Sequence, residues 1–236
     1  MDALKRLIVE ELEKEIDPNE QIRILQEINK MVLTEYVVQI GDFTVEPLLV
    51  EAYYYNAANG FDDCNTHCSE KQKRRFGKLY FHEAGRGGVD ICISCGEYYL
   101  SLLIKNSLAT NNGAPCFYRQ TQLDELLKGN GLAEAEEYVL KKRNTKKDDI
   151  VFHTVRKGLV KDNCFRNERL ASVTGFEMKD PAKRRYKFDL EKGRSKEYLI
   201  CEYIQAHPGL FTESEFKEKF LDYVPKQIRE IKGLLR

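Results

Sequence analysis

The sequence has no run of about 18 apolar residues, the length that a helix needs to cross a bilayer. Its opening stretch, MDALKRLIVEELEKEI, lacks the long apolar core and the small-residue cleavage site of a secretory signal peptide. We therefore expect a cytoplasmic protein that makes no use of a membrane. The seven cysteines lack the spacing of a disulfide framework, so we expect them to be reduced thiols.

An excess of charge of either sign is also missing, because 38 Lys and Arg balance 38 Asp and Glu. This balance does not exclude a nucleic-acid partner, since a local basic stripe can bind phosphates on a neutral protein. Internal repeats, low-complexity segments and the Walker and Rossmann glycine patterns are absent as well. The length of 236 residues fits one large domain, or one domain with a small appendage, and such a chain folds without disulfides or a metal.

Two amphipathic helices are predicted within residues 1–35, separated by a break at Asp17-Pro18-Asn19. The apolar positions that recur with helical spacing are Leu4, Leu7, Ile8, Leu12 and Ile16, then Ile22, Leu25, Ile28 and Val32. We expect this face to pack on the rest of the chain. An arm that binds a partner is the alternative.

Strands are predicted from Tyr36 onward, where β-branched and aromatic residues become frequent. GKLYFHE, GGVDICIS and YYLSLLIKNSL follow one another between glycine-containing turns, while FDDCNTHCSEKQKRRF is polar and typical of a loop. QLDELLKGNGLAEAEEYVLKKR is predicted to be helical around a Gly-Asn-Gly break. LASVTGFEMKDPAKRRYKFDL then predicts a strand, a turn at Asp180-Pro181 and a second strand.

The pattern as a whole predicts an α+β protein with an antiparallel β core. Its parts are an N-terminal helical segment over 1–35, the core over 36–194 and a C-terminal helical extension over 195–236.

Residues 47–105 contain the side chains that cleavage of an N-glycosidic bond requires. Glu51 ends the apolar stretch PLLVEAY, and a carboxylate can activate water or stabilise the cationic sugar. Aromatic rings can stack a base that has been flipped out of a duplex, and cations can bind its phosphates. The aromatic strand LYFH and the apolar strand LSLLIK, which ends at Lys105, complete the set. The basic run consists of Lys71, Lys73, Arg74 and Arg75.

In this order of motifs the chain resembles the alkyladenine (3-methyladenine) DNA glycosylase family. VEAY, His67, KQKRRF, LYFH, ICIS and LIKNSL follow the family's sequence of strands and loops. RLASVTGFEMKDPAKRRYKF resembles the closing strand pair of that family. The resemblance covers roughly residues 45–110 and 169–190, and it implies a β core of the glycosylase type.

The resemblance also implies roles for individual residues. Glu51 occupies the position of the base that activates water, and Lys105 that of an active-site arginine. Tyr53 and His67 match two residues of the pocket that stacks the flipped base. His82 stands where the family has a stacking tyrosine, and Cys92 where it has an asparagine that hydrogen-bonds the base.

The function implied is a base-excision DNA glycosylase that acts on damaged duplex DNA, removes an alkylated purine and needs no metal or organic cofactor. In this interpretation a neutral His82 ring stacks on a cationic base. Activity should then fall below about pH 6, given an unperturbed histidine pKa near 6.5.

Other interpretations remain open. The basic run could be a solvated loop rather than a phosphate-binding one. A zinc ion could be held by Cys64, His67, Cys68, Cys92 and Cys95, although strand alternation sends Cys92 and Cys95 to opposite faces. The fold could also serve a nucleic-acid-binding protein without catalysis. Alternatively, it could serve as the scaffold of an interaction module whose C-terminal helices bind a protein partner.

Overall fold

The computed structural model describes the ranges 2–83, 87–113, 115–147, 151–156, 165–166 and 168–174, the single positions 159 and 161, and, further on, 204, 208–209, 211–219, 224 and 235. The chain divides into two compact units, Met1–Thr174 and Gly175–Arg236. The boundaries predicted at 35 and 194 stay predictions. None of the helices in the described ranges is both long and apolar enough to cross a bilayer.

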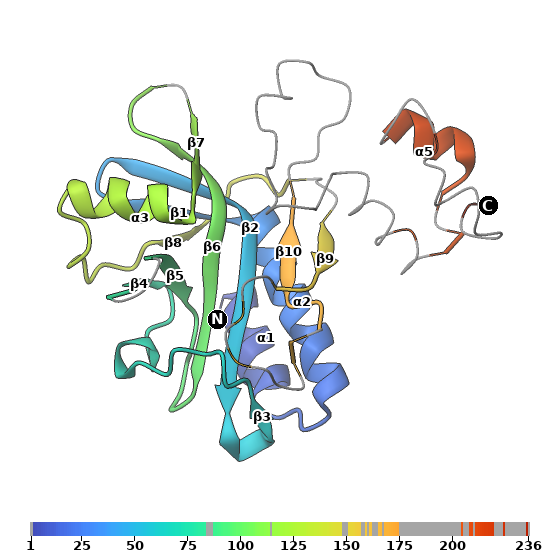
Figure 1. The fold of residues 1–236 in the computed structure, drawn as a ribbon, viewed down its shortest axis with the longest axis horizontal. Coiled ribbons are helices and arrows are strands. Elements are labelled where there is room, and N and C mark those ends of the chain that lie inside the picture. Colours follow the sequence, from blue (N-terminus) through green and yellow to red (C-terminus); the bar gives the residue numbers. More distant parts are fainter. Residues whose placement is uncertain are drawn as a thin grey trace. The chain divides into compact units, whose positions relative to one another are not determined.

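The first unit contains three α-helices and ten strands in its described residues (Figure 1). In chain order they are α1 (Ala3–Leu7), α2 (Pro18–Glu35), β1 (Tyr36–Ile40), β2 (Phe43–Asn56), β3 (Phe61–Asp62), β4 (Lys78–Phe81), β5 (Val89–Cys92), β6 (Tyr99–Thr110), β7 (Cys116–Arg119), α3 (Gln120–Gly129), β8 (Leu140–Lys142), β9 (Phe152–Thr154) and β10 (Ala171–Val173). A π-helical turn, Ile8–Leu12, continues α1, and short 3-10 turns lie at Ala57–Asn59 and Glu70–Gln72.

The N-terminal helices form where the sequence predicts them. Asp17 caps α2 by accepting a hydrogen bond from the Asn19 amide at 3.0 Å, and Pro18 occupies the first turn, where its missing N–H costs nothing. Leu4, Ile8 and Leu12 are buried, and Leu7 is partly buried. Ile16, however, is 74% exposed. Its prediction as part of the apolar face is wrong, because the π-helical turn ends at Leu12 and the chain leaves the helix before Ile16.

The strands of the described residues pair antiparallel in one curled sheet, as the sequence predicts at the level of an α+β fold. The main order is β4-β5-β6-β2-β1-β8, and β10 pairs with the middle of β2 and, on its other edge, with β9. The strand β2 is the centre of this arrangement. It pairs along most of its length with β6, with β1 and β10 on its other edge.

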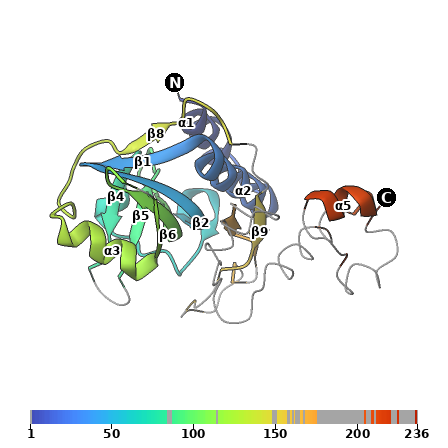
Figure 2. The same ribbon diagram turned by 90° about the horizontal axis from the view of Figure 1, so that it is seen from above.

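The two faces of this sheet differ in chemistry. Residues such as Ala52, Tyr54 and Leu102 belong to the main apolar core, together with Leu4 and Ile28 of the N-terminal helices. Because side chains alternate along a strand, the intervening residues of the same strands point to the other face. Figure 2 shows α1 and α2 on one side of the curled sheet and α3 on the other. The polar residues described below lie on the face opposite α1 and α2.

Two compensating irregularities interrupt the pairing of β2 with β6. Pro47 pairs with Ser107, Leu49 with Asn106 and Val50 with Ile104, so the register skips one residue on each strand. The skipped residues are Leu48 on β2 and Lys105 on β6. A proline cannot donate to the ladder, and bulges commonly redirect a side chain beside a functional site. Lys105 is the residue that this irregularity displaces.

Three sequence predictions need correction or fall outside the description. The helix predicted across 122–143 stops at Gly129, and its second half includes strand β8 rather than a helix. Gly129 and Gly131 end the helix, and Leu140–Lys142 find strand partners on β1. Of the strand pair predicted near 170–190, β10 is observed, and residues 175–190 lie outside the described residues. Of the C-terminal helices, α5 (Glu213–Lys219) is described.

Candidate functional site

Glu51 lies on the face of β2 that points away from the N-terminal helices, and it is 3% exposed. The hydroxyl of Tyr53, two residues further and therefore on the same face, donates to Glu51 Oε2 at 3.0 Å. Lys105 Nζ approaches the same oxygen at 3.7 Å. A cation and a hydrogen-bond donor thus offset the cost of burying this carboxylate. The sequence places Glu51 and Lys105 in one site, and the structure brings their charged groups together.

Tyr53 is held as a neutral hydroxyl. Burial and, second, the negative charge of Glu51 raise its pKa well above the usual value. A phenol that keeps its proton remains a donor to the carboxylate. Tyr53 therefore fixes the orientation of Glu51 rather than competing with it for a proton.

Arg156 packs against the ring of Tyr53. The Arg156 guanidinium carbon lies 4.7 Å from the centroid of the Tyr53 ring, in cation–π geometry. Its Nη1 donates to the carbonyl of Ala52 at 3.1 Å and forms an ion pair with Asp63, and both side chains of that pair are 0% exposed. Asp63 also accepts from the amide of Asn65, so the pair links β2 to the loop that carries His67.

A second buried carboxylate, Asp90 on β5, occupies the same face. Ser101 Oγ donates to Asp90 Oδ2 at 2.8 Å, Gln72 Nε2 donates to the same oxygen at 3.1 Å, and His82 Nε2 contacts Asp90 Oδ1 at 2.8 Å. Gln72 belongs to the 3-10 turn, and its Oε1 accepts from the amide of Ser69 at 3.1 Å. Asp90 therefore holds together β5, β6, the end of β4 and the loop before β4.

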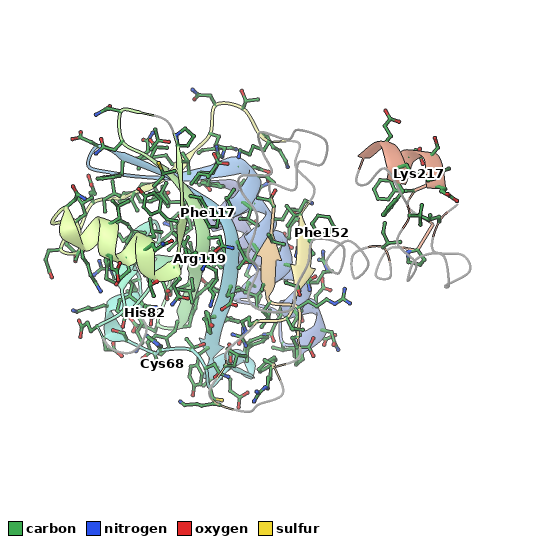
Figure 3. The ribbon with its side chains drawn as sticks, turned by 45° about the horizontal axis from the view of Figure 1, so that its top comes forward. Cys68, His82, Phe117, Arg119, Phe152 and Lys217 are labelled. Atoms are coloured by element: carbon green, nitrogen blue, oxygen red, sulfur yellow. The ribbon has the colours of Figure 1, made fainter. Side chains whose placement is uncertain are left out.

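His67 and His82 are neighbours, with ring centroids 4.2 Å apart, and Tyr80 lies 5.5 Å from His82. The sequence predicts that Tyr53, His67 and His82 enclose a flipped base. The two imidazoles contact each other, so a base would lie against this pair and not between its two rings. The pocket itself stays a prediction. Figure 3 shows His82 at the β4 end of the sheet near Cys68, while Phe152 lies on β9 at the opposite side.

The pKa of His67 is lowered from its usual value. Protein atoms that replace part of its hydration are the first cause, and the neighbouring His82 is the second. His67 is therefore neutral at pH 7.

Cys92 lies on the same face but has no exposed surface. Burial raises the pKa of its thiol far above the usual value, so it stays protonated. A base could reach Cys92 only after the covering residues had moved. The zinc interpretation gains no support within the described ranges, where no cluster of three or more His, Cys, Asp and Glu side chains has the geometry of a metal site.

Every member of the basic run is paired with a carboxylate. Lys71 contacts Glu83 at 2.5 Å, Lys73 contacts Glu70 at 2.8 Å, Arg74 contacts Glu97 at 2.5 Å and Arg75 contacts Glu136 at 2.9 Å. The local positive charge is therefore smaller than the sequence run suggests. Exposed pairs of this kind contribute little to stability, so phosphate groups could replace the carboxylates.

The sequence predictions missed several residues of this face. Asp90 could have been identified from the sequence. It lies between Val89 and Ile91 in an otherwise apolar strand, and a buried charged residue needs polar partners. Ser101 alternates with apolar residues in the same way. The pair of Arg156 and Asp63 could not be identified from the sequence, because the two residues lie 93 positions apart and no motif links them.

Comparisons of the sequence with protein-family models and with curated proteins found no match.

Proposed function

We propose that this face hydrolyses the N-glycosidic bond of a damaged purine in DNA, with Glu51 activating the attacking water. The observation that carries the proposal is the buried Glu51 carboxylate, which has Lys105 Nζ at 3.7 Å and the Tyr53 hydroxyl at 3.0 Å on one oxygen. The resemblance in motif order to the alkyladenine glycosylases supplies the reaction class.

The chemistry requires a base near the sugar and support for positive charge on it. Departure of the base leaves an oxocarbenium-like sugar, which the Glu51 carboxylate stabilises while it accepts a proton from water. Lys105 keeps Glu51 in place by charge attraction, and Tyr53 does so by its hydrogen bond. Neither residue needs to change its own protonation state during the step.

Recognition of the base rests on the aromatic side chains around the same face. Tyr53 has one ring face against Arg156, and we assign the other face to the base. The rings of His67 and His82, which contact each other, supply a second surface for stacking at the end of β4. Stacking of this kind is worth roughly 1–3 kcal/mol per base, which offsets the few kcal/mol that unstacking from the duplex costs.

The test compares base release from alkylated duplex DNA by the wild type, Glu51→Gln and Glu46→Gln. Glu46 is the matched control, because it also lies on β2 and pairs with Lys147 and Arg143, away from Tyr53. We expect Glu51→Gln to lower the rate by about 10²–10⁴-fold, the usual contribution of a general base, and Glu46→Gln to leave it unchanged.

A wild type that binds the duplex and releases no base, with Glu51→Gln binding equally well, would instead support a nucleic-acid-binding protein without catalysis. Equal loss of rate in both glutamine variants would show that Glu51 matters for folding only. Circular dichroism of all three proteins separates that outcome from a catalytic one.

A further inference from the structure

The face that carries Glu51 continues along β2 to a pair of partly exposed tyrosines. Alternation puts Tyr53 and Tyr55 on the side of Glu51, and the sheet register pairs Tyr55 with Tyr99 of β6. The rings of Tyr55 and Tyr99 lie 6.1 Å apart at an angle of 58°. Both keep part of their surface exposed, whereas the intervening Tyr54 is fully buried in the core. The Glu51 site is thus followed, on its own face, by an aromatic pair that the proposed chemistry does not use.

Lys73 brings a cation to this aromatic pair. Its Nζ lies 4.8 Å from the centroid of the Tyr99 ring and 2.8 Å from Glu70 Oε1, which also accepts from the Tyr99 hydroxyl at 2.8 Å. The amide of Arg74 donates to the carbonyl of Gly96 at 3.2 Å, so this end of the basic run is fixed beside the start of β6. Lys73 is therefore held against Tyr99 by its own side-chain contacts and by the backbone of its neighbour.

Glu70 is the carboxylate that a phosphate can replace here. Its side chain is 78% exposed, whereas that of Lys73 is 21% exposed. An ion pair with so exposed a partner contributes little, so the exchange of the carboxylate for a phosphate oxygen has a small cost. Asp62 lies opposite Tyr55 on β3, is also exposed and repels a phosphate. The backbone of a bound strand therefore belongs on the Lys73 side, with its base on the tyrosine rings.

The spacing along β2 sets how far along a strand the second base lies. Tyr55 is four residues beyond Glu51, which is about 13 Å at about 3.3 Å per residue. A stacked strand rises about 3.4 Å per nucleotide, so the aromatic pair lies about four nucleotides from the base at Glu51, and fewer where the strand is extended. Bases inside a duplex are paired and stacked on their neighbours, so they offer no ring face to Tyr55 or Tyr99. The surface therefore fits an unpaired strand.

We propose that Tyr55, Tyr99 and Lys73 bind a base and a phosphate of unpaired DNA beside the lesion, so that the Glu51 site prefers a damaged purine in a single strand. This inference rests on the proposed function for the reaction, while the binding of an unpaired strand does not depend on it. Aromatic rings that stack bases, next to cations that bind phosphates, are the arrangement by which proteins hold single strands with little regard for sequence. A lesion in a duplex is still a substrate, but it is bound less tightly.

The experiment measures the dissociation constant, by fluorescence anisotropy, of single strands that contain one 7-methylguanine. Each strand has one, two, four or six nucleotides on the 3′ side or on the 5′ side of the lesion, and base release from the same strands is measured under single-turnover conditions. We expect the affinity to rise about tenfold between the short and the long flanks on one of the two sides, which is within what stacking of one base contributes. The long single strand should also bind more tightly than its fully paired duplex.

Five variants assign this gain in affinity to residues. Tyr55→Ala and Tyr99→Ala should remove the gain and leave the affinity for the shortest strand unchanged. Tyr99→Phe keeps the ring and should behave as the wild type does. Glu70→Gln removes the charge that competes with phosphate and should tighten the binding of the long strands. Phe117→Ala is the control, because Phe117 is an aromatic residue of β7, which pairs with the opposite end of β6, and this variant should match the wild type.

Each outcome decides one claim. A gain that persists in both alanine variants, the absence of any gain in the wild type, or tighter binding of the duplex would overturn the inference, and release of the base in the same assays would leave the proposed function intact. Loss of affinity for strands of every length would show that the tyrosines support the fold and would overturn it as well. A gain that needs both tyrosines, without base release from any strand, would keep the binding surface and overturn the proposed function. Should Tyr99→Ala fail to fold, Tyr55→Ala decides the question.

Discussion

Replacement of Arg156 by methionine gives the sharpest test of how the site is held together. The substitution keeps an unbranched side chain but removes the guanidinium from Asp63, a carboxylate with no exposed surface. It also removes the donor to the Ala52 carbonyl and the cation over the Tyr53 ring. Loss of one partner from a buried ion pair costs about 3–5 kcal/mol, because the remaining charge is left without compensation.

Urea unfolding of the whole protein, followed by tyrosine fluorescence or circular dichroism, measures this loss in the free energy of unfolding of the first unit. With a urea m-value of about 2 kcal/mol/M, the midpoint should fall by about 1.5–2.5 M. The double variant Arg156→Met/Asp63→Asn should recover part of the stability, because it buries no unpaired charge while the Asn side chain can still accept from the Asn65 amide. Arg23→Met, which breaks an exposed pair with Glu20, is the control and should barely move the midpoint.

Two results would contradict a buried ion pair that stabilises the fold by its charge. One is an Arg156→Met midpoint equal to that of Arg23→Met, and the other is a double variant that is less stable than the single one. The first result would mean that Asp63 reaches water when Arg156 is absent. The second would mean that the hydrogen bonds of Arg156, rather than its charge, provide the stability.

Two further predictions concern the surface of the site. If the basic run binds phosphates, log K for duplex DNA should fall by about 0.9 per log unit of salt for each contact, and Arg74→Ala/Arg75→Ala should flatten that slope. An unchanged slope would assign the run to the solvated loop that its carboxylate partners suggest. At pH 8, iodoacetamide should label the exposed Cys116 and leave Cys92 and Cys95 unmodified in the native protein, as read by peptide mass spectrometry. Burial raises the pKa of Cys95 to about 11 and keeps Cys92 inaccessible, so rapid labelling of Cys92 would contradict the packing of β5.

Local patterns predicted much of the fold. The helices of residues 1–35 and the strands β4, β5 and β6 follow from periodicity, from the Asp17-Pro18 break and from glycine-containing turns, all of which act over a few residues. The helix predicted over residues 132–142 is wrong. The charged residues of this segment favour a helix in isolation, whereas pairing with β1 decides its structure in the folded chain.

The site was predictable only in part, for a related reason. Glu51 and Tyr53 lie two residues apart on one strand, so alternation alone puts them on one face. Lys105 reaches Glu51 and Tyr53 because of a bulge in β6, which residue spacing in the sequence does not predict. The partners of Tyr53 and Asp90, namely Arg156 and Gln72, come from loops whose paths depend on tertiary packing. Long-range contacts of this kind carry no signal in a single sequence.

The central claim is that the Glu51 face breaks an N-glycosidic bond in DNA. Its most direct test incubates excess wild-type protein with duplexes that each contain one damaged purine, followed by mass spectrometry of the free bases. We expect one equivalent of free base per duplex for at least one lesion, with the DNA chain intact until alkali cleaves it at the abasic site. Recovery of every duplex with its lesion still attached, under conditions in which the protein binds the DNA, would contradict it.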